Sequence, residues 1–165
     1  MTKRLFMICP TDFIEPIIQE KFDGQKHFYS ALGISFTVEQ NDMNDLITVI
    51  KKHEIEEISF VLSETNKIIM DATQGQKFID IRGLKSKYQK IIEKRNLTHQ
   101  MWSTHDHHAL FLSYYLNDKI GKLREHLCIH SMPALKVNAK IYSKAYNNFR
   151  EIYPELSLSD PIRIN

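Results

Sequence analysis

Two apolar runs of strand length, residues 5–9 and 58–62, constrain the fold of this chain more than any other feature. Short, continuous apolar runs are typical of strands buried on both faces, as in parallel sheets. Each run gives way abruptly to polar residues, and in an open α/β sheet ligands and catalytic groups collect at the carboxyl ends of the strands. We therefore expect a ligand-binding site there. Its candidate residues are Cys9, Thr11, Asp12, Phe13, Ser63, Glu64, Asn66 and Lys67.

The rest of the chain alternates between strand-like and helix-like segments. Further strands are predicted at 26–32, 135–141 and 149–153, and helices at 13–22, 41–53, 66–72, 84–94 and 105–127. The early order of strand, helix, strand, helix, strand and helix predicts an α/β fold. This is a three-layer sandwich with a mainly parallel central sheet and helices on both faces. The segment 135–141 alternates apolar and polar residues, which indicates a strand with one solvated face in a C-terminal edge hairpin.

Two of the predicted helices carry clear local signals. Asp12 is placed to cap the helix 13–22, with Pro16 in the first turn of that helix. The helix that ends at residue 53 repeats apolar residues at helical spacing, which predicts a face packed against the core. These residues are Met43, Leu46, Ile47 and Ile50.

Length and composition are those of an ordinary globular protein. The 165 residues predict one domain, 1–165, with an irregular tail from about residue 154. The net charge is only +2, which gives no electrostatic case for binding nucleic acid or an anionic membrane. No stretch approaches the roughly 18 apolar residues of a membrane span. The two cysteines, Cys9 and Cys128, have no spacing typical of a disulfide framework, so we expect free thiols and a cytoplasmic protein.

The residues around the two apolar runs resemble the β-class carbonic anhydrases. In that family the first strand ends in Cys-x-Asp-x-Arg, followed by an apolar residue, an acidic residue and a proline. Here Cys9 begins the run Cys-Pro-Thr-Asp-Phe-Ile-Glu-Pro. The family's third strand ends in Gly-His-x-x-Cys, where this chain has Ser-Glu-Thr-Asn-Lys at 63–67. The resemblance covers roughly residues 4–153 and implies the fold of that family.

Most of the residues that hold zinc in this family are replaced. Position by position, the resemblance places the first cysteine at Cys9, the histidine at Glu64 and the second cysteine at Lys67. It places the family's aspartate–arginine pair at Thr11 and Phe13. An ammonium group cannot ligate zinc, and a phenylalanine side chain cannot orient a neighbour by hydrogen bonds. Catalytic zinc needs three protein ligands and an open position, so we expect neither a metal nor another cofactor here.

We therefore expect a non-catalytic carbonic anhydrase-like protein, a pseudoenzyme, that binds a small anion or a protein partner through the degenerate metal-site pocket. Two roles for Lys67 stay open. It forms an ion pair with Glu64 that replaces the metal as a strut, or it holds an anion together with the backbone amides of 63–67. The resemblance further implies a homodimer.

A different class of function stays open beside this one. A metal-dependent lyase, hydratase or hydrolase with a relocated zinc site would use Cys9 with Glu64, or the histidine cluster of segment 99–108. That cluster consists of His99, His105, His107 and His108. Its simpler interpretation is that Thr104 or Asp106 caps the long helix while the imidazoles face solvent. Cys9 likewise has two interpretations, a reactive thiol or a small buried hydrophobe.

Overall fold

The computed structural model describes residues 1–35, 40–101 and 106–154. Its strands are β1 (Lys3–Ile8), β2 (Gln25–Ser30), β3 (Glu57–Ser63), β4 (Lys136–Ser143) and β5 (Asn148–Glu151). Its α-helices are α1 (Glu15–Lys21), α2 (Gln40–His53), α3 (Lys67–Gln74), α4 (Leu84–Met101) and α5 (His107–Ile129). Two short 3-10 turns, η1 (Pro10–Asp12) and η2 (Leu32–Ile34), follow β1 and β2.

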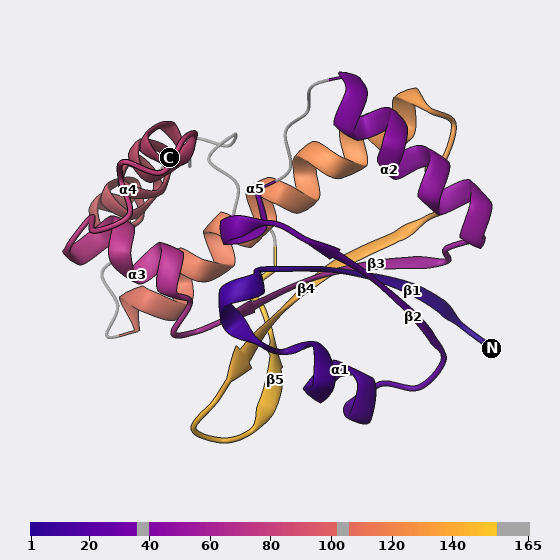
Figure 1. Cartoon of the computed structure of the whole chain (residues 1–165), viewed down its shortest axis with the longest axis horizontal. Helices are drawn as coiled ribbons and strands as arrows, with labels where there is room; N and C mark the ends of the chain where they lie inside the picture. The colour runs from indigo at the N-terminus through magenta and orange to yellow at the C-terminus, as the bar shows by residue number, and fades with distance from the viewer. Residues whose placement is uncertain (36–39, 102–105, 155–165) are drawn as a thin grey trace, which may run out of the picture.

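The five strands form one sheet in the order β2-β1-β3-β4-β5. β1 pairs in parallel with β2 and with β3, and β3 pairs in parallel with β4. β5 runs antiparallel to β4 at the edge of the sheet, and a hairpin turn joins these two strands (Figure 1). The predicted α/β class, the mainly parallel sheet and the C-terminal edge hairpin are therefore confirmed.

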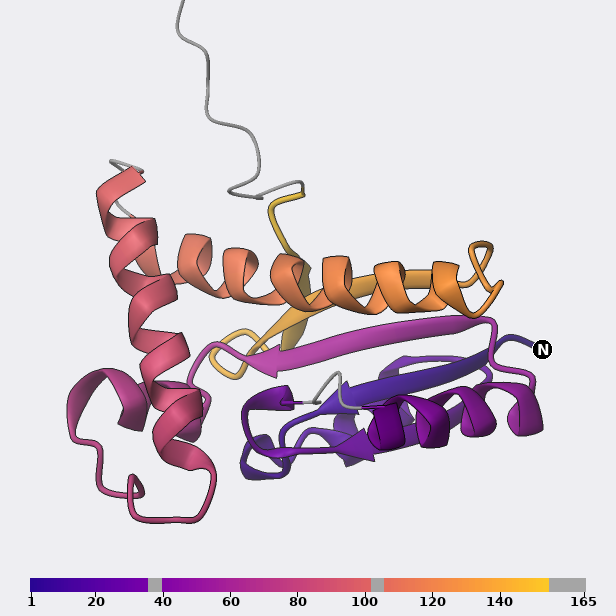
Figure 2. The same ribbon diagram turned by 90° about the horizontal axis from the view of Figure 1, so that it is seen from above.

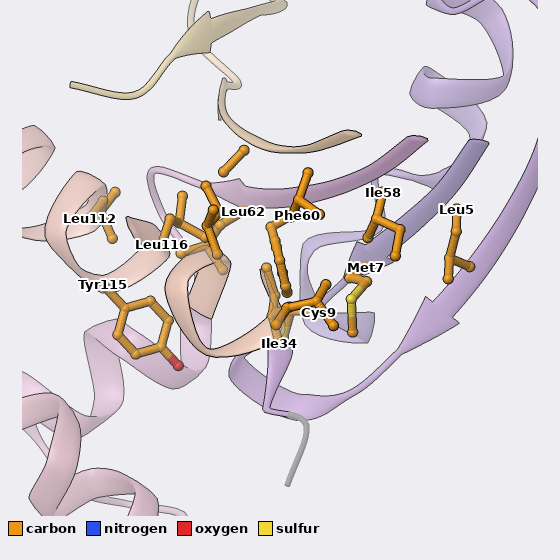
Figure 3. Close-up of a cluster of buried hydrophobic side chains, with 14 of the residues drawn as sticks. Leu5, Met7, Cys9, Ile34, Ile58, Phe60, Leu62, Leu112, Tyr115 and Leu116 are labelled. Carbon is orange, nitrogen blue, oxygen red and sulfur yellow. The ribbon is translucent and has the colours of Figure 1, made fainter. Parts of the chain in front are cut away.

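Each face of the sheet has its own core. On one face, Ile14 and Ile18 of the α1 segment pack with Phe6, Ile8 and Val61 of β1 and β3. On the other face, α2 and α5 cover a larger apolar cluster, part of which is drawn in Figure 3. Figure 1 shows α1 on one side of the sheet and α2 and α5 on the opposite side, so the three-layer prediction is also confirmed.

The burial of α2 and β4 follows their sequence patterns. The four apolar residues at helical spacing in α2 are all buried. In β4, Val137, Ala139 and Ile141 are buried, whereas the intervening Asn138 and Lys140 are half-buried. Removing these apolar stripes from water is the dominant favourable contribution to docking both elements on the sheet.

The segment after β1 differs from its prediction. α1 begins at Glu15 rather than at residue 13, because the backbone of Phe13 has a left-handed φ of 53°, which a right-handed helix cannot include. Ile14 is the N-cap, and Pro16 lies in the first turn as predicted. Asp12 therefore does not cap this helix. Its carboxylate faces the end of β3 instead.

The helices of the C-terminal half run further than their patterns predicted. α4 continues to Met101 and α5 to Ile129. Asp106 caps α5, because its carboxylate accepts the Ala109 N–H at 3.1 Å. Figure 2 shows α4 crossing steeply to α5, beyond the end toward which β3 points. Within the predicted helix 105–127, residue 105 lies outside the described residues and Asp106 lies just before α5. The tail from 155 also lies outside the described residues. No described helix is long and apolar enough to cross a lipid bilayer.

Candidate functional site

The carboxyl ends of β1 and β3 lie side by side at one edge of the sheet. The two strands are parallel neighbours, with Ile8 of β1 paired to Val61 of β3. Cys9 follows β1 directly, and Ser63 is the last residue of β3. Because the strands end at the same edge, the polar segments that follow them meet, as the sequence predicted.

Asp12 joins these two strand ends. One of its carboxylate oxygens accepts the Ser63 N–H at 2.8 Å, and the other accepts the Nδ2–H of Asn66 at 2.7 Å. Asn66 is fully buried and caps α3, because its Oδ1 accepts the Ile69 N–H at 3.0 Å. Burial raises the pKa of Asp12 to about 6, although both hydrogen bonds favour the ionised carboxylate. We call Asp12, Ser63 and Asn66 the Asp12 junction.

Cys9 points away from this junction into the larger core. Its side chain is fully buried, and its Sγ accepts the Gly33 N–H at 3.2 Å and lies 3.1 Å from the Thr11 hydroxyl. The Tyr115 hydroxyl donates to the Gly33 carbonyl at 2.6 Å, so α5 is bonded to the same residue of η2 whose amide contacts the thiol. Figure 3 shows Cys9 and Tyr115 among the side chains of this core. This environment fits the interpretation of Cys9 as a small buried hydrophobe.

Glu64 is held by the C-terminal hairpin. Its Oε1 accepts the Ser143 hydroxyl at 2.7 Å, and its Oε2 pairs with the Arg150 guanidinium at 3.3 Å. The expected ion pair between Glu64 and Lys67 is therefore wrong. Since α3 begins only at Lys67 and its N-cap is Asn66, Glu64 lies outside the helix, and the i, i+3 proximity that the ion pair requires does not arise.

The backbone amides of the turn after β3 are already used within the chain. The Ser63 amide donates to Asp12, and the Glu64 amide donates to the Tyr142 carbonyl at 3.0 Å. The amides of Thr65 and Asn66 both donate to Ser63, to its hydroxyl and its carbonyl respectively. Four of the five amides in 63–67 therefore already donate to acceptors within the protein, and these four are not left to donate to an anion beside Lys67.

Lys67 lies exposed at the first position of α3. Its ammonium group is 5.9 Å from the centre of the Phe13 ring, within the range of a cation–π contact. The Phe13 side chain is 75% exposed and its backbone is left-handed. Each of these two features is unusual for a large apolar residue. A hollow of about 470 Å³ beside α3 is lined by Lys67, Thr65 and Lys77, among others. We call it the Lys67 hollow.

The eight predicted site residues do not line one common cavity. Cys9 and Phe13 line a cavity of about 240 Å³ next to α1. Lys67 lines the Lys67 hollow, and Glu64 lines a third cavity of about 450 Å³, which adjoins the Lys67 hollow at Met70 and Gln74 of α3. Asp12, Ser63 and Asn66 line none of these three cavities and connect the two strand ends to each other instead.

Sequence reasoning missed the partners that come from distant segments. Ser143 and Arg150 lie 79 and 86 positions after Glu64, and Tyr115 lies 82 positions after Gly33. The alternating pattern of β4 was the available signal for Ser143, because a strand paired with β3 in parallel ends at the same edge. No comparable signal pointed to Arg150 or Tyr115.

The histidine cluster does not assemble as a ligand set in the described residues. The rings of His99 and His107 stack with centroids 4.6 Å apart and planes inclined by 16°. The Nε2 of His108 lies 2.6 Å from the Glu64 carbonyl oxygen. His105 lies outside the described residues. Among residues 1–35, 40–101 and 106–154, no three His, Cys, Asp or Glu side chains are grouped to hold a metal ion.

Solved structures with the same arrangement of strands and helices are β-carbonic anhydrases. Wild-type CafD from Aspergillus fumigatus has a TM-score of 0.69 at 12% sequence identity, over 93% of this chain and 90% of that chain. CafA of the same fungus has a TM-score of 0.70 at 12% identity, over 92% and 75% of the two chains. The chain has the β-carbonic anhydrase fold.

A Coccomyxa β-carbonic anhydrase in complex with acetazolamide extends the likeness, with a TM-score of 0.66 at 13% identity over 91% of this chain and 71% of that chain. Neither a protein-family model nor a curated protein matches the sequence. The sequence resemblance to β-carbonic anhydrases is thus confirmed at the level of the fold.

The residues at the carboxyl ends of β1 and β3 do not fit the zinc ion of β-carbonic anhydrases. Of the three positions that the resemblance assigns to zinc ligands, Lys67 offers an ammonium group, which has no lone pair to donate. Glu64 is bound to Ser143 and Arg150, and the Cys9 thiol is enclosed by Gly33 and Thr11 in the core. The donor set falls short of the three ligands that catalytic zinc requires.

Proposed function

We propose that this chain is a non-catalytic protein of the β-carbonic anhydrase fold that binds a small anion at the Lys67 hollow. The observation that carries the proposal is the position of Lys67. Its exposed ammonium group lines a hollow at the carboxyl edge of the sheet, next to the Asp12 junction. A cation replaces a zinc-binding cysteine at this position of the resemblance, so the local chemistry favours an anion over a metal ion.

The lining of the Lys67 hollow supports a small anion as the ligand. Lys77 adds a second exposed ammonium group, and Thr65 adds a hydroxyl donor. Asp71 is the carboxylate in this lining. Burial raises its pKa, but the Tyr88 hydroxyl and the amides of Phe78 and Lys77 outweigh burial and hold the pKa below its usual value. These donors occupy the Asp71 oxygens. Lys77 is also attracted to the Asp71 carboxylate, so Lys67 is the principal cation for the anion.

Anion-dependent thermal unfolding of the purified protein tests this proposal. Bicarbonate, phosphate and acetate are the probes, each at constant ionic strength. At least one of them is expected to raise the unfolding temperature of the wild type, and Lys67→Ala should remove that increase. Lys51→Ala, which removes an exposed lysine from α2, is the matched control and should keep it. If no probe stabilises the wild type, the small-anion function is wrong and a protein partner becomes the better interpretation.

Metal analysis tests the non-catalytic part of the proposal separately. We expect the purified protein to carry no stoichiometric zinc and to show no hydration of CO2. Zinc bound at one equivalent and lost in the Cys9→Ser variant would instead establish a metal enzyme. Zinc lost only in the His108→Ala variant would point to the histidine cluster.

We further propose that the protein is a cytoplasmic homodimer. Solved proteins of this fold include two tetrameric β-carbonic anhydrases from Sordaria macrospora, which form larger assemblies of such chains. Both cysteines are free thiols, which suits a reducing compartment. Light scattering should give twice the mass of the single chain, and a monomer at micromolar concentration would contradict the dimer.

A further inference from the structure

A cavity that adjoins the Lys67 hollow at Thr65, Met70 and Gln74 has a different charged lining. Its volume of about 450 Å³ falls in the range of small-ligand sites. It lies between α3, the last turns of α4, the start of α5 and β5, so segments distant in the sequence form its wall. Two arginines, Arg95 from α4 and Arg150 from β5, belong to this wall. We call it the arginine cavity.

Both arginines make only long hydrogen bonds to their neighbours. In the described part of the chain, the Arg95 guanidinium donates to the Thr73 carbonyl at 3.4 Å, and the Arg150 guanidinium donates to Glu64 at 3.3 Å. Both distances exceed the usual 2.7–2.9 Å of a charge-assisted hydrogen bond. Because a guanidinium carries five N–H donors in a planar fork, each arginine retains donors that can bind an anionic group.

The other ionisable side chains in the wall have partners of their own. Glu64 accepts the Ser143 hydroxyl at 2.7 Å in addition to Arg150. Asp106 caps α5 through the Ala109 amide. The Nε2 of His108 lies 2.6 Å from the Glu64 carbonyl oxygen, a contact that requires the proton on this nitrogen. Among the described residues, Arg95, which donates to a neutral carbonyl, is therefore the cation of this wall that no carboxylate compensates, and Arg150 adds the N–H donors that Glu64 does not take.

The floor of the cavity is apolar. Ile69, Phe111 and Leu112 line it, and all three are at most 2% exposed because they also belong to the larger core. Met70 and Ala109 extend this apolar surface, and Thr65, Thr73 and Gln74 form the polar remainder of the wall. A ligand with an apolar body and a charged group would match both parts of the lining. A small inorganic anion would match only the arginines.

We propose that the arginine cavity is a second binding site, which takes a monocarboxylate with a compact apolar body, such as an aromatic or branched aliphatic acid. The carboxylate is held by Arg95 and Arg150, and the apolar body lies on Ile69, Phe111 and Leu112. Planar guanidinium groups match the two oxygens of a carboxylate. The site adjoins the Lys67 hollow, but its two arginines do not line that hollow and the two lysines do not line this cavity, so it does not depend on the anion proposed there.

Calorimetric titration of the full chain with benzoate tests this inference. Benzoate should bind at least tenfold more tightly than acetate, which lacks the apolar body, and than benzyl alcohol, which lacks the charge. Arg95→Gln should weaken benzoate binding at least tenfold. Arg82→Gln removes an exposed arginine outside the cavity and should leave the affinity unchanged. Since Arg95 is exposed, both variants are expected to fold.

Three results would overturn the inference. They are the absence of benzoate binding, equal affinities for benzoate and acetate, and an Arg95→Gln variant that binds as the wild type does. Lys67→Ala distinguishes the two sites, because it should leave benzoate binding intact. Benzoate binding that Lys67→Ala abolishes but Arg95→Gln does not would place the ligand in the Lys67 hollow, so this inference would fail while the proposed function would stand.

Discussion

The carboxylate of Asp12 accepts a hydrogen bond of 2.7 Å from the side-chain amide of Asn66. Asn66 simultaneously caps α3, so this single bond connects the turn after β1 to the helix after β3. The same carboxylate holds the last amide of β3. Hydrogen bonds between protein groups therefore connect the carboxyl ends of β1 and β3, and Asp12, which accepts two of these bonds, is ionisable.

The stability of the protein should depend on the ionisation of Asp12. Its pKa is 3.8 when unperturbed and about 6 in the fold, so the folded state favours the protonated acid. The stabilisation from protonation is complete below pH 3.8 and is lost as the pH rises through 6, with a magnitude on the order of 2–3 kcal/mol. The Asp12→Asn variant cannot titrate. Urea unfolding from pH 4 to 7.5 should show the wild type losing stability relative to this variant, whereas a constant difference would contradict the raised pKa.

Removal of the Asn66 side chain should raise the pKa of Asp12 further. The Asn66 amide favours the ionised carboxylate, and Asn66→Ala deletes that bond together with the cap of α3. We expect a loss of about 1–2 kcal/mol of stability from the cap and the buried bond. Carbon-detected NMR titration of the Asp12 carboxyl group measures the pKa directly. A pKa that falls in the variant would show that the amide does not act as assigned.

The two partners of Glu64 should differ in their contribution to stability. Ser143 is fully buried, so Glu64→Ala leaves a buried hydroxyl without its acceptor and should cost about 1–3 kcal/mol. Arg150 is 46% exposed, so Arg150→Ala removes only a solvent-screened ion pair and should cost less than about 1 kcal/mol. Urea unfolding of both variants at neutral pH compares them. The assignment fails if Arg150→Ala is the more damaging change.

The hydroxyl of Tyr115 should stabilise the turn next to Cys9. It donates to the Gly33 carbonyl at 2.6 Å in the core, so Tyr115→Phe leaves that carbonyl without this donor and should cost about 1–2 kcal/mol. Tyr146→Phe is the matched control, because Tyr146 is 79% exposed and its substitution should change stability by less than about 0.5 kcal/mol. Equal effects of the two variants in thermal unfolding would contradict this role.

The sheet and its helices were predictable because buried strands and buried helix faces need apolar residues at characteristic spacings. β1 and β3 are covered on both faces, so their residues 5–8 and 58–62 had to be apolar with Ser59 as the one exception. The face of α2 and the alternation of β4 carry the same information at their own periods. Parallel pairing of β1 and β3 then brought their carboxyl ends together, as expected from the order of the elements.

The side-chain partners at that edge were not predictable, since they depend on segments far apart in the chain. Glu64 pairs with Arg150 because the hairpin of β4 and β5 brings the arginine to it. Asp12 has the sequence signature of a helix cap, but the left-handed backbone of Phe13 delays the helix and frees the carboxylate for Ser63 and Asn66. Local propensity cannot anticipate such a tertiary choice.

The enclosure of Cys9 gives the protein a built-in reporter of its own opening. A colourimetric thiol reagent should count one sulfhydryl in the native state, at the exposed Cys128, and a second only after denaturation. The rate at which that second sulfhydryl reacts under native conditions would then measure how often the structure around Cys9 opens, without any label or engineered probe.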